Sequence, residues 1–273
     1  MSDEKVWEKQ ALEHLLLENL KEQRRGRRWR TAVRMMTLLV FVGVAINLFD
    51  IDIGGKSSMG KHTALVDLQG EIAPDSKASA DAINASLQAA FENSESVGVI
   101  LRINSPGGSP VQSGIIHDEM LRLRAKYPEK SLHVVVEEIC ASGGYYVASA
   151  AENIYVDKAS LVGSIGVIMN GFGVTGLMEK LGIERRAITA GKNKALLDPF
   201  SKQDPKQKEF VQGMISEVHE QFIKVVRDGR GDRLKETPDM FTGLVWNGAK
   251  SVELGLSDGL SSVDGVARAV FKA

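Results

Sequence analysis

From residue 63 onward, short apolar runs alternate with segments whose apolar residues recur at helical spacing. Short apolar runs bounded by turn residues are typical of buried strands, and a repeat of about 3.6 residues is typical of helices. The pattern predicts strands over residues 64–68, 98–103, 132–136, 154–156, 166–169 and 185–189. It predicts helices over residues 79–91, 111–126, 145–151, 175–181, 205–229, 247–254 and 263–271. This alternation predicts an α/β domain over residues 63–273, with helices on both faces of the sheet.

Residues 1–62 follow a different pattern. Residues 1–30 carry apolar positions at helical spacing and many basic residues, which indicates a cytoplasmic amphipathic segment. Residues 31–53 are mostly apolar and reach the length of about 20 residues that spans a bilayer, if Arg34 extends its charge to the headgroups. Residues 54–62 are rich in Gly, Ser and Lys, which is typical of a linker.

The charges on the two sides of residues 31–53 predict how this segment crosses the membrane. Seven Lys or Arg residues and one acid lie between Lys21 and Arg34, whereas Asp50 and Asp52 lie at the other end. Positive charge stays in the cytoplasm. We therefore expect a single-pass signal anchor in the cytoplasmic (inner) membrane, with the catalytic domain periplasmic or otherwise extracytoplasmic. A buried core helix and a cleaved signal peptide are the alternatives, but no A-x-A cleavage site follows the apolar run.

Composition narrows the chemistry. The net charge of −1 gives no overall attraction to nucleic acid, so no nucleic-acid partner is expected. Cys140 is the only cysteine, so no intramolecular disulfide can form, and we expect it to pack as a small apolar residue. The five histidines are scattered, and no Cys/His cluster has the spacing of a zinc site. We expect no metal and no cofactor.

Ser142 stands where a predicted buried strand gives way to a predicted helix, and two glycines follow it. Glycines let a substrate backbone approach closely, and the first N–H groups of a helix point toward any oxyanion that forms there. Ser142 is therefore a candidate nucleophile. The alternative is a serine that only caps the helix.

Three further stretches bear on this chemistry. Gly107 and Gly108 form a stiff turn after a predicted strand, so their N–H groups are candidate oxyanion donors. A serine nucleophile needs a base, but no histidine lies between His133 and His219. Lys194 can serve if burial keeps it neutral; Lys192 is a local rival, and a solvated surface lysine is the alternative. Ser164, in a Gly-rich turn, is placed to orient a lysine or simply to satisfy the turn.

Five motifs stand in order along residues 63–265: N-S-P-G-G, A-S-G-G-Y-Y, G-S-I-G-V-I, A-G-x-x-K and W-N-G-A-K-S-V-E-L-G-L-S-D-G-L. This series resembles the signal peptide peptidase A (protease IV) family of membrane-anchored Ser-Lys proteases. The resemblance implies a Clp/crotonase-like layered fold of short strands and covering helices, preceded by one transmembrane helix. It implies Ser142 as nucleophile, Lys194 as general base and Ser164 as the serine that hydrogen-bonds this lysine. Gly143 and the Gly107–Gly108 turn, Gly108 above all, would donate to the oxyanion.

The resemblance also implies partners and substrates. Ala195 stands where the family usually has an acid, so any contact from that position is absent. The short single-domain form implies a homo-oligomeric ring. Hydrophobic peptides near the membrane, such as cleaved signal peptides, are the expected substrates, and their backbone would add to an exposed sheet edge.

Other functions remain open at this point. A Ser-His-Asp protease would need a histidine shortly after Ser142. A crotonase-like acyl-coenzyme A enzyme would need Glu137 or Glu138 as a working carboxylate. An inactive membrane scaffold would not require Ser142 and Lys194 together.

Overall fold

The structure, a computed structural model, describes residues 29–31, 33–42 and 60–272 and divides the chain into two units, before and after residue 60. Residues 29–31 and 33–42 are helical. Among the described residues, no helix combines the length and the apolar character that a membrane crossing requires. Most of the predicted amphipathic segment (1–30), span (31–53) and linker (54–62) lie outside the described residues.

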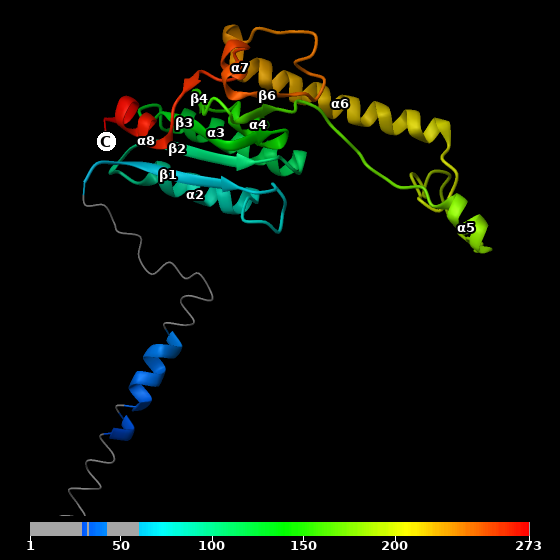
Figure 1. Ribbon diagram of the computed structural model, residues 1–273, viewed down its shortest axis with the longest axis horizontal. Coiled ribbons are helices and arrows are strands. Elements are labelled where there is room, and N and C mark those ends of the chain that lie inside the picture. Colours follow the sequence, from blue (N-terminus) through cyan, green and yellow to red (C-terminus); the bar gives the residue numbers. More distant parts are fainter. Residues whose placement is uncertain (1–28, 32, 43–59, 273) are drawn as a thin grey trace, which may run out of the picture. The chain divides into compact units, whose positions relative to one another are not determined.

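The second unit is built on a sheet in which five parallel strands follow the order β1-β2-β3-β4-β7. They are β1 (His62–Gln69), β2 (Ser96–Ser105), β3 (Leu132–Ala141), β4 (Asn153–Val156) and β7 (Gly259–Leu260). The carboxyl half of β3 leaves β4 and pairs with β5 (Leu161–Gly163), which in turn pairs with the antiparallel β6 (Val245–Asn247). The predicted α/β class is confirmed (Figure 1).

Helices connect and cover these strands. They are α2 (Ala80–Glu92), α3 (Pro110–Lys126), α4 (Gly143–Ala148), α5 (Thr175–Leu181), α6 (Pro205–Arg230), α7 (Gly248–Glu253) and α8 (Val263–Val266), with short turns η1 (Gly231–Arg233) and η2 (Ala267–Phe271). Local chemistry sets several starts. Ser109 accepts a hydrogen bond from the Gln112 amide at the first turn of α3, and Pro110, which has no N–H to satisfy, follows it.

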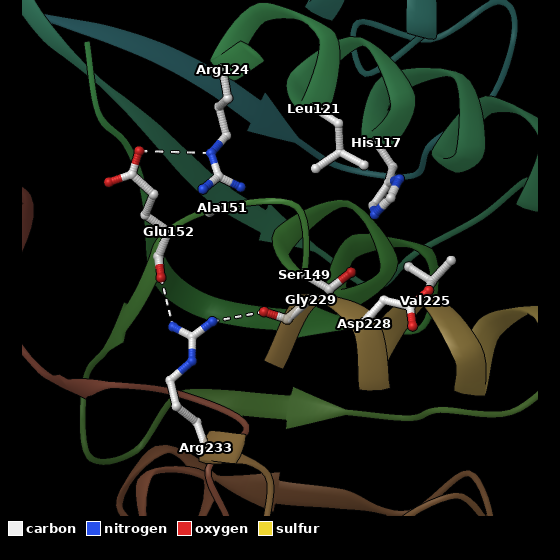
Figure 2. A pocket seen from close by; sticks show the side chains of 10 residues that line it. All are labelled: His117, Leu121, Arg124, Ser149, Ala151, Glu152, Val225, Asp228, Gly229 and Arg233. Atoms are coloured by element: carbon white, nitrogen blue, oxygen red, sulfur yellow. Dashed lines mark hydrogen bonds and ion pairs between the residues drawn. The ribbon is translucent and has the colours of Figure 1, made fainter. Parts of the chain in front are cut away.

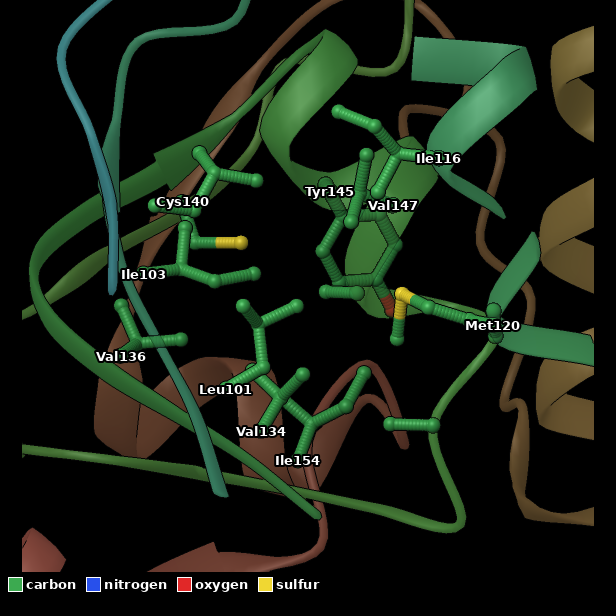
Figure 3. Close-up of a cluster of buried hydrophobic side chains, with 14 of the residues drawn as sticks. Leu101, Ile103, Ile116, Met120, Val134, Val136, Cys140, Tyr145, Val147 and Ile154 are labelled. Atoms are coloured by element: carbon green, nitrogen blue, oxygen red, sulfur yellow. The ribbon is translucent and has the colours of Figure 1, made fainter. Parts of the chain in front are cut away.

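The main hydrophobic core lies between one face of the sheet and helices α2, α3 and α4. Figure 3 shows the part of it that α3 and α4 cover. Leu101 and Ile103 from β2 and Val134 and Val136 from β3 meet Ile116 of α3 there, and all five are at most 2% exposed. Residues fully buried on one sheet face fit the near-continuous apolar runs of β2 and β3. This packing fixes where β3 ends and α4 begins.

The other face of the sheet is covered only in part. A smaller cluster joins Ile100 and Val135 to Val266 of α8, and Phe271 packs over Gly98, where an added methyl group would overlap its ring. Further along this face, Arg102 is paired with Asp67 in the open. The expectation of helices on both faces therefore holds fully for one face and partly for the other.

Two predicted strands are wrong. Residues 166–169 and 185–189 have no regular secondary structure, and both lie in the segment between β5 and α6. Their apolar side chains find no neighbouring strand, and Ile168 and Ile188 are 78% and 101% exposed. An apolar run forms a strand only where a partner edge is available. The predicted helices over residues 175–181 and 205–229 are confirmed as α5 and α6.

Candidate active site

Ser142 occupies a strained turn between β3 and α4. Its φ of 51° and ψ of −123° lie in a region that side chains rarely adopt, and its amide donates to the carbonyl of Gly163 on β5. Its side chain makes no capping hydrogen bond, so the capping alternative is wrong. Ser142 is thus strained and partly exposed, and its side chain does not cap the helix. Such a serine is arranged to present its hydroxyl to a ligand.

The glycine turn after β2 lies directly against Ser142. A methyl group added at Gly107 would lie 2.7 Å from the Gly143 nitrogen and 2.7 Å from the Ser142 Cβ. One added at Gly143 would lie 3.3 Å from the Gly108 nitrogen. In the sequence, Gly107 and Gly108 belong to one motif and Ser142 and Gly143 to another, and the structure brings the two motifs together.

The glycine turn leaves one N–H group for a substrate, and the start of α4 leaves a second. Ile72 holds the glycine turn in place through two hydrogen bonds, each 2.8 Å long: the Ile72 amide donates to the Gly107 carbonyl, and the Ser109 amide donates to the Ile72 carbonyl. Within the described residues, the N–H groups of Gly108 and Gly143 have no protein acceptor. Two unpaired donors beside a serine hydroxyl are the arrangement that stabilises an oxyanion.

A cavity of about 150 Å³ opens beside Ser142. Its floor includes Ser142 and Gly143, and its walls come from α3, α4, α6 and the segment after β5: Gly108, Pro110, Ser113, Tyr146, Gly166, Val167, Ile168, Val218, Gln221 and Phe222. Most of these wall residues escaped the sequence reasoning. Val218 and Phe222 belong to the apolar stripe of α6, but only the fold turns that stripe toward Ser142.

The two lysines predicted as candidate bases do not line the cavity beside Ser142. Lys194 and Lys192 are exposed, and neither lines the cavity beside Ser142. Both belong to the segment between α5 and α6, which Figure 1 places near the N-terminal end of α6. Ser164 lies directly after β5, ahead of α5, with a φ of 52°, and its amide donates to the Leu244 carbonyl. Ser164 itself is two residues from Gly166 in the cavity wall.

No histidine lines this cavity in the part of the chain that the structure describes. His117 on α3 packs edge-on against Tyr146, with ring centroids 5.3 Å apart, and burial lowers the pKa of its imidazole. His219 on α6 is bonded through Nε2 to the Ile165 carbonyl at 3.1 Å. A Ser-His pair at Ser142 therefore has no candidate among the described residues.

A second cavity of about 480 Å³ lies behind α4, between α3 and α6 (Figure 2). Arg124 and Arg233 enter it from opposite sides, and Glu152 joins them: its carboxylate lies 3.7 Å from Arg124, and its carbonyl accepts from Arg233 at 2.6 Å. Arg233 also donates to the Gly229 carbonyl at 2.7 Å. Both arginines therefore already have partners within the protein, and their role is to hold neighbouring helix ends together.

Cys140 and the carboxylates near Ser142 have other roles. Cys140 is fully buried, as expected, and burial raises the pKa of its thiol. Glu137 and Glu138 line a separate trough on the open sheet face, where Glu137 pairs with Arg102 at 3.3 Å. Among the described residues, no group of three or more His, Cys, Asp or Glu side chains is arranged to hold a metal ion.

Comparison with known proteins adds a family to this geometry. The model of peptidase family S49 matches residues 124–272. A putative protease of Synechocystis sp. is 30% identical over 209 residues, covering 76% of this chain and 72% of that protein. A putative signal peptide peptidase SppA of Enterococcus faecium is 31% identical over 161 residues, covering 59% of this chain and 46% of that protein.

Higher identity is found with part of a longer protein. A Brucella melitensis protein named Na(+)/H(+) antiporter NhaA is 42% identical over 177 residues, covering 65% of this chain but 24% of that protein. The chain thus spans about a quarter of this relative and about half of the Enterococcus protein. About three quarters of the Brucella protein lies outside this match, and the antiporter name refers to that whole protein.

Proposed function

Because this chain belongs to peptidase family S49, the signal peptide peptidase A family, we propose that it is a membrane-anchored serine endopeptidase that hydrolyses hydrophobic peptides such as cleaved signal peptides. The observation that carries the proposal is the turn at Ser142. Its hydroxyl is at the edge of an apolar cavity, within reach of two unpaired N–H groups. That combination suits attack on a peptide carbonyl.

The reaction is acyl transfer to Ser142. A neutral base takes the Ser142 proton, the Oγ attacks the peptide carbonyl, and the N–H groups of Gly108 and Gly143 hold the oxyanion. The base then protonates the leaving amine, and water releases the acyl group. The apolar walls formed by Tyr146 and Phe222 favour a hydrophobic side chain next to the bond that is cut.

Lys194 is the proposed base, oriented by Ser164. The absence of histidine from the described cavity lining supports a lysine, and a lysine works as a base only when burial lowers its pKa. Lys194 is exposed in a single copy, so a second copy must bury it.

Assembly into a homo-oligomeric ring is the proposed means of burying Lys194. The stretch between β5 and α6, which includes Lys194, exposes large apolar side chains that a neighbouring copy would cover, among them Ile168, Phe172 and Ile188. Lys194 of one copy would then meet Ser142 of the next. Anchoring by residues 31–53 in the cytoplasmic membrane, with the catalytic domain outside the cytoplasm, is part of the same proposal.

The test uses the full chain in mild detergent, with an unfolded protein and a fluorogenic hydrophobic peptide as substrates between about pH 6 and pH 10. Ser142→Ala and Lys194→Ala are expected to abolish hydrolysis, whereas Lys192→Ala, the matched neighbour, keeps it. Activity should rise with pH through one ionisation as the base loses its proton. Full activity in Lys194→Ala would refute the lysine, and full activity in Ser142→Ala would refute the nucleophile.

Mixing the two inactive variants tests whether two copies share the site. If Lys194 acts on the neighbour's Ser142, random co-assembly of equal amounts restores about a quarter of wild-type activity, because half of the serines and half of the lysines are intact. If both groups come from one copy, the mixture stays inactive.

A further inference from the structure

His219 fastens α6 to the segment that forms the opposite wall of the cavity beside Ser142. Its Nε2 is 3.1 Å from the carbonyl oxygen of Ile165. A carbonyl only accepts hydrogen bonds, so Nε2 carries a proton and donates it. The His219 ring is half-buried and Ile165 is fully buried, so this bond is partly shielded from the solvent.

The wall that begins at Ile165 has few other anchors. Upstream, the Ser164 amide donates to the Leu244 carbonyl at 2.8 Å, and the Gly166 amide donates back to Ser164 at 2.9 Å. After Gly166, the next backbone hydrogen bond among the described residues joins the Val174 amide to Pro199. Ile165 is held by its buried side chain, and its bond to His219 joins α6 to the start of residues 166–168, which line the cavity.

The wall facing them comes from the same stretch of α6. Val218 precedes His219 and Phe222 follows it by one helical turn, and both line the cavity opposite Val167 and Ile168. The hydrogen bond thus lies at the point where the two apolar walls are joined. A packed cavity of about 150 Å³ accepts or rejects a side chain on small changes in width.

We propose that His219 is a positioning residue that sets the width of this cavity and so selects which substrate side chain enters it. The inference rests on the proposed peptidase function. Without the Nε2 donor, the Ile165 carbonyl loses its partner and turns toward water, and residues 166–168 move away from α6. The widened cavity then discriminates less between a leucine and a phenylalanine side chain.

The test compares full-length variants on two peptides that differ only in the residue whose carbonyl is attacked, leucine or phenylalanine. His219→Leu removes the donor, and His219→Gln keeps an amide donor at the same distance along the side chain. Glu220→Gln, on the exposed side of the same turn, is the matched control. Rates of Ser142 labelling by a small fluorophosphonate, which does not need the cavity, are measured in parallel.

For His219→Leu we expect kcat/KM on the peptide that the wild type prefers to fall about fivefold, mainly through KM, since one hydrogen bond is lost. The ratio of kcat/KM between the two peptides should fall by a similar factor. Ser142 labelling should stay within about twofold, since the turn at Ser142 is untouched. His219→Gln and Glu220→Gln should match the wild type. If His219→Leu unfolds, His219→Asn, whose amide is too short to reach Ile165, must give the same loss of selectivity.

Three results would overturn the inference, each in a different way. Wild-type protein that hydrolyses neither peptide in a Ser142-dependent manner would refute the proposed function and, with it, this role for His219. Wild-type protein that is active and Ser142-dependent, with unchanged peptide preference in His219→Leu or His219→Asn, would refute the positioning role alone. Failure of His219→Gln to restore the preference would likewise exclude the hydrogen bond as its cause.

Discussion

Asp258 is expected to carry a large part of the stability of the second unit, although it lies far along the chain from Ser142. Its carboxylate accepts two hydrogen bonds from Arg230, both at 2.9 Å, and one from the Ile154 amide at 2.7 Å. The Arg230 side chain is fully buried, and that of Asp258 is 14% exposed. The pair therefore joins the end of α6 to β4 in a largely buried place, and Arg233 donates to the same carboxylate at 3.1 Å.

Asp258→Asn keeps the shape of the side chain and leaves Arg230 as a buried charge without a counter-ion. Breaking a buried pair in this way costs about 3–5 kcal/mol, which corresponds to a drop in melting temperature on the order of 10 °C for a unit of this size. Glu236→Gln is the matched control. Glu236 also accepts two hydrogen bonds from one arginine, Arg227, at 2.7 Å each, but its side chain is 43% exposed. The expected cost there is about 0–1 kcal/mol.

Urea unfolding followed by circular dichroism measures both free energies of unfolding. Equal losses in Asp258→Asn and Glu236→Gln would refute the argument from burial. Acid provides a second check. Burial alone would raise the pKa of Asp258, but the hydrogen bonds and charge of Arg230 hold that pKa below its usual value. The pair's contribution is therefore present above the unfolded pKa of about 3.8 and is lost as the pH falls through the lower folded pKa. The gap between wild type and Asp258→Asn should narrow only in that acidic range.

Three further outcomes follow from the packing. Gly98→Val should displace the Phe271 ring and lower the free energy of unfolding by about 1–3 kcal/mol in urea titrations. Gly114→Ala is the control, because an added methyl group there has open space. A loss in Gly98→Val no larger than in the control would contradict the close approach of Phe271 to Gly98. Cys140 should resist a thiol reagent in the native protein and react only as fast as the protein unfolds, so rapid native labelling would show that it is accessible. Burial lowers the pKa of His133, so its neutral form favours the folded state; this contribution is present above about pH 6.5 and declines as the pH falls below that value. His133→Phe should therefore make stability vary less between pH 7 and pH 5, and an unchanged slope in urea titrations at several pH values would refute this.

The sequence predicts the central sheet and its helices because their apolar spacing is imposed locally. Leu101, Ile103, Val134 and Val136 form strands because both neighbours and a covering helix are present. Residues 166–169 have the same apolar character but no partner edge, so the strand prediction failed there. The two-residue β7 and the three-residue β6 are too short to leave a pattern, since tertiary pairing alone defines them.

The candidate site divides along similar lines. Ser142 and the three glycines were found because a turn that leaves N–H groups free needs small residues at fixed places. Their mutual contact, however, comes from the pairing of β2 with β3. The contribution of α6 to the cavity walls could not be inferred, because an apolar repeat predicts a helix but does not predict which edge of the sheet that helix will cross. The position of Lys194 relative to Ser142 stays a prediction.

The left-handed backbone of Ser142 has a consequence for how this site can change over generations. A non-glycine residue in that conformation costs on the order of 1–3 kcal/mol, and glycine adopts it with less strain. A serine-to-glycine change would therefore remove the proposed nucleophile and relieve strain in the same step. At this position, mutations that increase stability favour glycine, whereas selection for a working hydroxyl favours serine. A copy of the gene released from the need for catalysis would lose its chemistry here before it lost its fold.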